Sequence, residues 1–139
     1  MSLWPNFSTK ELKAVSSVLK SRKVNYLTGD YGKLFEKKFS TYHKLKYCLA
    51  VSNGSIAIEL VLKSLNLKPE DEVIVTSKSF IASASSVVLT GSKPIFCDVN
   101  IDSQNIDIKN IVKAFSSKTK AVICVHLGGW PCEMKSIVK

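Results

Sequence analysis

Residues 71–99, DEVIVTSKSFIASASSVVLTGSKPIFCDV, contain the clearest structural pattern in the chain. Two apolar runs, Val73–Thr76 and Pro94–Val99, flank a segment of small and apolar residues that ends at Gly91. Neither run alternates between apolar and polar residues, which indicates strands that are covered on both faces. The segment between them predicts a helix with Gly91 at its C-terminal end. A strand, a helix and a second strand in this order favour a parallel sheet.

The same alternation extends to both sides of this segment. Tyr47–Val51 and Lys120–Val125 are further apolar runs, and Ile56–Leu65 and Asp107–Phe115 have the spacing and the Asp cap expected of helices. We therefore predict an α/β fold with a mostly parallel sheet. Ligands bind at the carboxyl ends of strands in such sheets, so the loops after residues 51, 77, 99 and 125 are the candidate functional loops.

The first part of the chain shows a helical pattern. Ser8 and Glu11 have the spacing of a capping box, and apolar residues follow at helical intervals as far as about Ser21. After a turn at 28–32, a second set of apolar residues predicts another helix. We expect an N-terminal helical segment at residues 1–45 and an α/β domain at residues 46–139.

Composition excludes several classes of protein. Apolar residues make up 45% of the 139, which is too many for a disordered tail. No apolar run approaches the roughly 20 residues of a bilayer helix, and the N-terminus lacks the pattern of a signal peptide. We expect a soluble cytoplasmic protein without a membrane partner. The four cysteines form no CxxC pair, so we interpret them as small buried hydrophobic residues and predict no metal site.

The net charge of +9 is concentrated near the N-terminus. Residues 10–46 hold ten basic and three acidic side chains, a local net charge of +7. Such a patch is compatible with nucleic-acid binding. However, 19 of the 20 basic residues are Lys, and nucleic-acid recognition favours the planar guanidinium of Arg. We favour two solvated helices and predict no nucleic-acid partner.

The turn at Val51–Ser55 is the first candidate binding loop. It joins an apolar run to a predicted helix, so free backbone amides and the positive end of the helix dipole lie at this turn. Gly54 permits close approach of an anion, and Ser55 adds a hydroxyl donor. The turn is therefore a candidate phosphate site, and an ordinary Asn-Gly turn with a Ser cap is the alternative. It matches neither a P-loop nor a dinucleotide fingerprint.

Two further residues lie after predicted strands. The ring of Phe80 is either part of the core or available to stack on a planar cofactor. His126 follows the last apolar run, where a hydrogen-bonded structural role is the favoured interpretation. No catalytic Ser/His/Asp set, paired carboxylates or metal cluster can be assembled from the sequence.

Several short segments together resemble the DegT/StrS family of sugar aminotransferases, which depend on pyridoxal phosphate (PLP). In chain order they are Thr28-Gly, Phe35-Glu36, Val51-Ser-Asn-Gly-Ser-Ile-Ala57, Asp71-Glu-Val-Ile-Val-Thr-Ser77, Ser79-Phe-Ile-Ala82, Gly91 with Lys93-Pro-Ile-Phe-Cys-Asp98, Asn105-Ile-Asp107, Lys118-Thr-Lys-Ala-Val-Ile123, and Val125-His-Leu with Gly129 and Pro131. The resemblance covers nearly the whole chain but only about the first third of a family protein. It implies an N-terminal fragment containing part of the large domain of the aspartate-aminotransferase (type I) fold.

The resemblance also implies particular binding residues. Gly54, Ser55 and Ile56 match the turn that holds the PLP phosphate, although the family usually has a smaller Ala where Ile56 stands. Phe80 matches the ring that stacks on the PLP pyridine, and residues 28–31 match a loop near the substrate entrance. Lys78 stands where the family commonly has an apolar residue.

The implied activity is transfer of an amino group, from glutamate or a similar donor, to a nucleotide-linked keto sugar, as in the synthesis of cell-surface polysaccharides. Family members are homodimers, and their catalytic lysine belongs to a part of the family sequence beyond position 139. We therefore assign no catalytic residue and expect the fragment to be inactive. The alternatives are a PLP-dependent sugar dehydratase of the same family, a basic non-enzymatic binding module, and a nucleotide-binding α/β domain.

Overall fold

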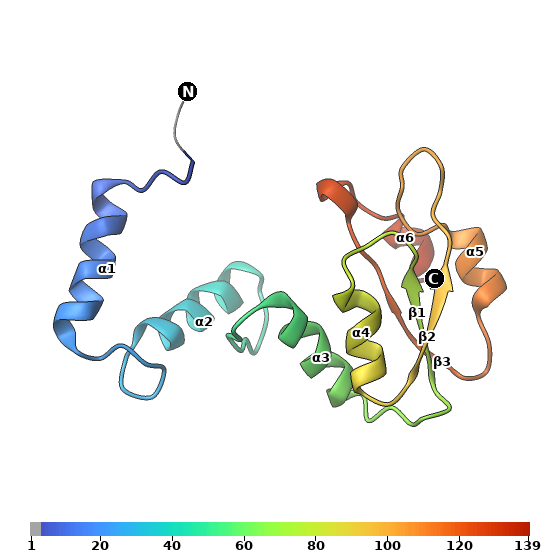
Figure 1. The fold of residues 1–139 in the computed structure, drawn as a ribbon, viewed down its shortest axis with the longest axis horizontal. Helices are drawn as coiled ribbons and strands as arrows, with labels where there is room; N and C mark the ends of the chain where they lie inside the picture. The colour runs from blue at the N-terminus through green and yellow to red at the C-terminus, as the bar shows by residue number, and fades with distance from the viewer. Residues whose placement is uncertain (1–3) are drawn as a thin grey trace. The chain divides into compact units, whose positions relative to one another are not determined.

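The computed structural model describes residues 4–139 (Figure 1). The chain forms two compact units, one ending at Ala50 and one beginning at Val51. The helices are α1 (Thr9–Ser21), α2 (Tyr31–Tyr42), α3 (Gly54–Ser64), α4 (Ala82–Leu89), α5 (Ile108–Ala114) and α6 (Met134–Ile137). The strands are β1 (Glu72–Thr76), β2 (Lys93–Cys97) and β3 (Thr119–Ile123), and a 3-10 turn, η1, spans Leu127–Gly129.

Local sequence signals determine the ends of α1. Ser8 is the N-cap: the Glu11 amide donates to Ser8 Oγ over 3.3 Å, and the Ser8 amide donates to Glu11 Oε2 over 2.7 Å. These reciprocal bonds confirm the predicted capping box. The helix ends at Arg22, which adopts a left-handed φ of 60°. Neither α1 nor α2 has a buried residue, so the first unit contains two amphipathic helices with exposed apolar faces.

The second unit is built on a parallel sheet in the order β2-β1-β3. Ile74 of the central strand pairs with Ile95 of β2 and with Val122 of β3. Because β1 has a neighbour on each side, its residues 73–75 are completely buried. The predicted α/β class is confirmed, and parallel pairing brings the carboxyl ends of all three strands to one edge.

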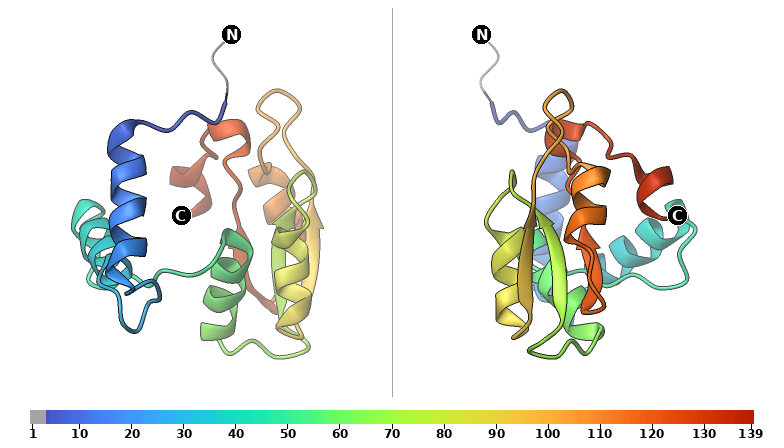
Figure 2. Two further views of the ribbon diagram at one scale, coloured as in Figure 1. Left: turned by 60° about the vertical axis from the view of Figure 1, so that its left-hand side comes forward. Right: turned by 90° about the vertical axis from the view of Figure 1, so that its right-hand side faces the viewer.

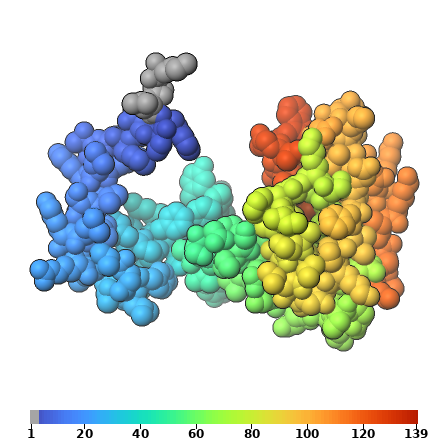
Figure 3. Space-filling view, in the orientation of Figure 1, coloured from blue at the N-terminus to red at the C-terminus, as the bar shows by residue number. Residues whose placement is uncertain are grey.

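Helices cover both faces of this sheet (Figure 2). On one face, Val73 and Val75 pack with Leu62 of α3 and Val87 of α4. Figure 3 shows the side chains of these two helices, in green and yellow, adjoining each other on the surface. On the other face, Ile74 packs with residues of α5 and with Cys97 and Cys132. Consecutive strand residues therefore enter opposite cores, which explains the absence of polar alternation in the apolar runs.

Two predicted helix ends are confirmed. Asp107 is the N-cap of α5, and its Oδ1 accepts from the Lys109 amide over 2.7 Å. Gly91 follows α4 with a φ of 82°, a conformation that strongly favours glycine.

The apolar run at Tyr47–Val51 does not form a strand, so residues 4–139 contain three strands where the runs suggested four. A strand needs a neighbour for its backbone groups, and no segment of the described chain pairs with this one. The Ala50 amide instead donates to the Glu36 carboxylate over 2.8 Å.

Candidate functional site

The loops that follow the strands meet at the carboxyl edge of the sheet, to which the arrowheads of β1 and β2 point in Figure 1. Two side-chain contacts connect the loop after β1 with the loop after β2. Ser77 Oγ donates to Asp98 Oδ1 over 3.5 Å, and Lys78 Nζ donates to Gln104 Oε1 over 2.7 Å. Lys78, which stands where the family commonly has an apolar residue, is therefore hydrogen-bonded to the neighbouring loop.

Asn105 connects the loop after β2 with the turn after β3. Its side chain is buried, Oδ1 accepts from the Leu127 amide over 3.1 Å, and Nδ2 donates to the Trp130 carbonyl over 2.9 Å. The sequence alone indicates no role for Asn105. An asparagine shortly before a helix cap is a weak sequence signal for a loop contact, because its hydrogen-bond partners lie more than twenty residues further along the chain.

His126 stands at the start of this turn with an exposed ring. Its Nδ1 accepts from the Cys132 amide over 3.1 Å, which supports the predicted hydrogen-bonded role. The Cys132 thiol donates to the Val125 carbonyl over 3.2 Å. Burial raises the pKa of this thiol above its usual range, which keeps it protonated and able to donate.

The predicted phosphate turn forms the N-terminus of α3. Asn53 is the N-cap: its Oδ1 accepts from the Ile56 amide over 3.0 Å, and its carbonyl accepts from the Ala57 amide over 3.2 Å. The cap is thus Asn53 rather than a Ser. Within residues 4–139 the amides of Gly54 and Ser55 have no acceptor, and neither has the Ser55 hydroxyl. A Cβ added at Gly54 would meet nothing within 4 Å, so open space adjoins these donors.

Phe80 lies on the loop between β1 and α4, and its side chain is 73% exposed. Within the described chain the ring of Phe80 is therefore not part of the core, and its face is free to stack on a planar group. Ser79 and Ser83 share a hydrogen bond of 2.8 Å that fixes the backbone beside Phe80 to the first turn of α4.

The N-terminal turn of α3 and the Phe80 loop are linked through α4. The Phe80 loop leads into α4, and α4 packs against α3. The buried Ser86 of α4 donates to the Ser55 carbonyl over 3.5 Å, and α3 lies against α4. Ile56 belongs to the same turn, and its side chain is 42% exposed. Two free amides and a hydroxyl at the N-terminus of α3, and an exposed aromatic ring just before α4, therefore belong to one helix pair and its entry loop.

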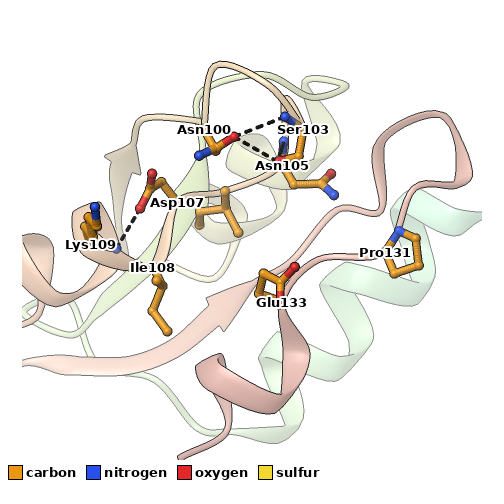
Figure 4. A pocket seen from close by; sticks show the side chains of 9 residues that line it. Asn100, Ser103, Asn105, Asp107, Ile108, Lys109, Pro131 and Glu133 are labelled. Carbon is orange, nitrogen blue, oxygen red and sulfur yellow. Dashed lines mark hydrogen bonds between the residues drawn. The ribbon is translucent and has the colours of Figure 1, made fainter.

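A separate cavity of about 260 Å³ lies beside the loop after β2 (Figure 4). Its polar side chains already stabilise turns: Asn100 Oδ1 accepts from the Ser103 amide over 3.1 Å, and Asp107 caps α5. None of the predicted site residues lines it. We interpret this cavity as a consequence of loop structure rather than as a binding site.

Neither a metal site nor a membrane-spanning helix is found in the part of the chain that the structure describes. No group of three or more His, Cys, Asp or Glu side chains there could hold a metal ion. None of its helices has both the length and the apolar character required to cross a membrane.

Residues 5–139 match the sequence model of the DegT/DnrJ/EryC1/StrS aminotransferase family. The chain is 37% identical over 135 residues to the GDP-perosamine synthase of Escherichia coli O157:H7, an alignment that covers 97% of this chain and 37% of that protein. Its structure matches an aminotransferase from Psychrobacter cryohalolentis with a TM-score of 0.93 and 45% identity, over 99% of this chain and 35% of that one.

A further match is the crystal structure of GDP-4-keto-6-deoxymannose-3-dehydratase with a trapped PLP-glutamate geminal diamine. It has a TM-score of 0.85 and 32% identity, and the match covers 95% of this chain and 35% of that one. The chain thus spans about a third of the length of these relatives.

Proposed function

Because the chain belongs to the DegT/DnrJ/EryC1/StrS aminotransferase family of PLP-dependent enzymes that act on nucleotide sugars, we propose that the protein carrying it is such a transaminase. The proposed reaction moves an amino group from glutamate, or a similar donor, to a keto sugar on a nucleotide carrier. We propose that residues 46–139 begin the PLP-binding domain, after a helical segment at 1–45, and that the whole protein is a homodimer.

The N-terminus of α3 is the observation that carries this proposal. A phosphate group needs several hydrogen-bond donors and a favourable electrostatic potential. The free amides of Gly54 and Ser55 and the Ser55 hydroxyl supply the donors, and the dipole of α3 supplies the potential. The open space beside Gly54 leaves room for the phosphate oxygens. The residues present therefore fit the phosphate of PLP.

Phe80 and Ile56 complete the proposed cofactor site. The exposed ring of Phe80 offers an apolar face to the pyridine ring. The Ile56 amide is already engaged by Asn53, so we assign Ile56 a packing role beside the phosphate instead of a donor role. When bound, PLP would supply an electron sink for chemistry at the amino carbon.

No residue in 1–139 is assigned a catalytic role. PLP transaminases need a lysine that binds the cofactor covalently and moves a proton, and no lysine of this chain lies in a matching motif. We accordingly propose that residues 1–139 alone do not catalyse transamination.

A sugar dehydratase of the same family is the second candidate. The similarity of this chain to GDP-4-keto-6-deoxymannose-3-dehydratase favours it. The two candidates are distinguished by incubating the full-length protein with GDP-4-keto-6-deoxymannose, PLP and glutamate. A transaminase gives an amino sugar that keeps the nitrogen of glutamate. A dehydratase gives a sugar in which hydrogen has replaced the 3-hydroxyl group, and it releases ammonia. Glutamate is the electron donor and becomes 2-oxoglutarate in both reactions, so the sugar product and the release of ammonia distinguish the two.

Replacement of Ser55 tests the cofactor site. We expect Ser55→Ala to weaken PLP binding by the full-length protein about tenfold, because a hydrogen bond to a charged phosphate is lost. Titration of PLP followed by its absorbance measures the affinity. Ser64→Ala, at the other end of α3, is the matched control and should leave the affinity unchanged. Equal PLP affinities for the wild type and Ser55→Ala would contradict the proposed cradle.

A further inference from the structure

The hydrogen bond at His126 fixes which ring nitrogen carries hydrogen. The Cys132 backbone amide can only donate, so His126 Nδ1 must accept with its lone pair. A neutral imidazole carries one N–H, and with Nδ1 as the acceptor this hydrogen lies on Nε2. His126 therefore presents a donor at the far side of its ring.

That donor has no partner in the described chain. Nε2 of His126 makes no hydrogen bond to any of residues 4–139, and the ring is exposed. A structural role for His126 accounts for Nδ1 alone. Any polar residue that can accept from the Cys132 amide would fill that role, so the structural role does not require the outward Nε2–H donor.

The topology brings this donor to the edge at which the proposed cofactor site lies. His126 is three residues beyond the end of β3, and Phe80 is four residues beyond the end of β1. β1 and β3 are adjacent and parallel, so both residues follow neighbouring strand ends. Ligands of doubly wound sheets bind in this position.

Independent contacts hold the turn that carries His126. The Asn105 side chain accepts from the Leu127 amide and donates to the Trp130 carbonyl, both of which belong to this turn. The Cys132 thiol binds the Val125 carbonyl beside it. Gly128 and Gly129 adopt φ values of 61° and 86°, which close a turn that other residues adopt only with strain. The ring is thus held at a defined place, as a ligand-contacting group requires.

We propose that His126 is a ligand-contacting residue whose Nε2–H donates to an oxygen acceptor of the bound PLP or of the substrate. This inference rests on the proposed function, because it takes its ligand from that site. The shared chemistry is a phenolate, carboxylate or hydroxyl oxygen at the carboxyl edge of the sheet. The two sources, cofactor and substrate, are separated by experiment.

Two substitutions separate the two nitrogens of His126. The side-chain oxygen of Asn can occupy the place of Nδ1 and accept from the Cys132 amide, but Asn lacks a donor at the place of Nε2. Gln reaches the place of Nε2 with its NH₂ group and loses the acceptor near Cys132. His126→Asn should therefore keep the Tm of the full-length protein and lose the ligand contact. His126→Gln should lower the Tm and retain part of the contact.

The readouts are PLP affinity from absorbance titration and the KM for the keto sugar and for glutamate. We expect His126→Asn to weaken one of these about tenfold, the loss typical of one hydrogen bond to a charged group. A change in PLP affinity assigns the acceptor to the cofactor. A change in KM at unchanged PLP affinity assigns it to the substrate. His43→Asn is the matched control, since His43 is an exposed histidine of the first unit whose ring lies against Phe39.

Two results would overturn the inference. One is a His126→Asn protein with wild-type PLP affinity and wild-type KM values. The other is a ¹⁵N-histidine spectrum in which Nδ1 rather than Nε2 of His126 carries the hydrogen. The spectrum and the PLP titration do not depend on turnover. If they agree with the inference while no transamination is found, the proposed function alone has failed.

Discussion

At the scale of single residues, Asn105 shows how one buried amide can position a functional loop. Its two hydrogen bonds satisfy the Leu127 amide and the Trp130 carbonyl, which flank the two glycines of η1. Both polar atoms of the side chain, Oδ1 and Nδ2, make hydrogen bonds, so a smaller apolar residue cannot replace Asn105 without leaving two backbone groups unpaired.

We predict that Asn105→Ala lowers the free energy of unfolding by about 2 kcal/mol, mainly through those unpaired groups. Urea denaturation of the full-length protein measures this change. Asn110→Ala is the control, since the Asn110 side chain makes no hydrogen bond within residues 4–139. Comparable stability losses in the two variants would show that the hydrogen bonds of Asn105 are not the cause.

The burial of the cysteines is also a question at the scale of single residues. All four are free thiols. Cys97 and Cys132 are buried, as predicted, whereas Cys48 and Cys124 are only half-buried. Burial raises the pKa of Cys97, and the carboxylates of Asp107 and Asp98 raise it further. The folded protein therefore favours the protonated thiol.

This shift predicts a loss of stability in alkaline solution. The stabilisation is complete below the pKa of the unfolded thiol and is lost as the pH rises through the higher pKa of the folded thiol. Urea denaturation between about pH 8 and pH 10 should show the decline, because an unfolded thiol titrates near pH 8.5. Cys97→Ala should show a shallower decline than the wild type. If the two slopes coincide, Cys97 does not contribute to the pH dependence.

At the scale of elements, the N-terminus of α3 combines a cap with a proposed anion site. Asn53 occupies the Ile56 amide and leaves the amides of Gly54 and Ser55 free. A carboxylate at position 53 could make the same cap and would interact favourably with the helix dipole. It would also repel a phosphate bound at the adjacent amides.

We therefore predict opposite effects of Asn53→Asp on stability and on cofactor binding. The free energy of unfolding without PLP should stay equal or rise slightly, while PLP affinity should fall by about tenfold at low ionic strength through charge repulsion. Asn110→Asp adds the same charge in α5 and serves as the control. An unchanged PLP affinity in Asn53→Asp would mean that the phosphate binds elsewhere.

Elements with local signals were predictable from the sequence. The capping box of α1, the Asp107 cap of α5 and the glycine after α4 each lie within three residues of the helix end that they specify. The absence of a strand at Tyr47–Val51 was not predictable. The apolar character of this run indicates burial, but it does not show whether a neighbouring strand is available for pairing. The same limit applies to the candidate site. Gly54 and Ser55 have a local signal and Phe80 is proposed from the family resemblance, whereas the hydrogen bonds of Asn105 join residues distant in sequence and could not be predicted.

At the scale of the whole molecule, β3 is one of the two edge strands of the sheet, and β2 is the other. β3 pairs with β1 on one side and has no strand neighbour on the other within the described chain. An apolar groove of about 330 Å³ lies between β3 and α3, and another of about 370 Å³ lies between β3, α5 and α6. An unpaired apolar edge strand is a site for association with other chains.

We predict that the chain of residues 1–139, produced by itself, self-associates through these surfaces. Val61 of α3 lines the first groove and is 62% exposed, so Val61→Glu should reduce association by placing a charge in the apolar contact. Sedimentation velocity at several concentrations measures the distribution of species. Ser64→Glu is the control, because it adds the same charge on α3 at a position that does not line the groove. A single monomeric species at micromolar concentration in the wild-type chain, with a cooperative thermal transition, would show that the exposed edge is tolerated in solution.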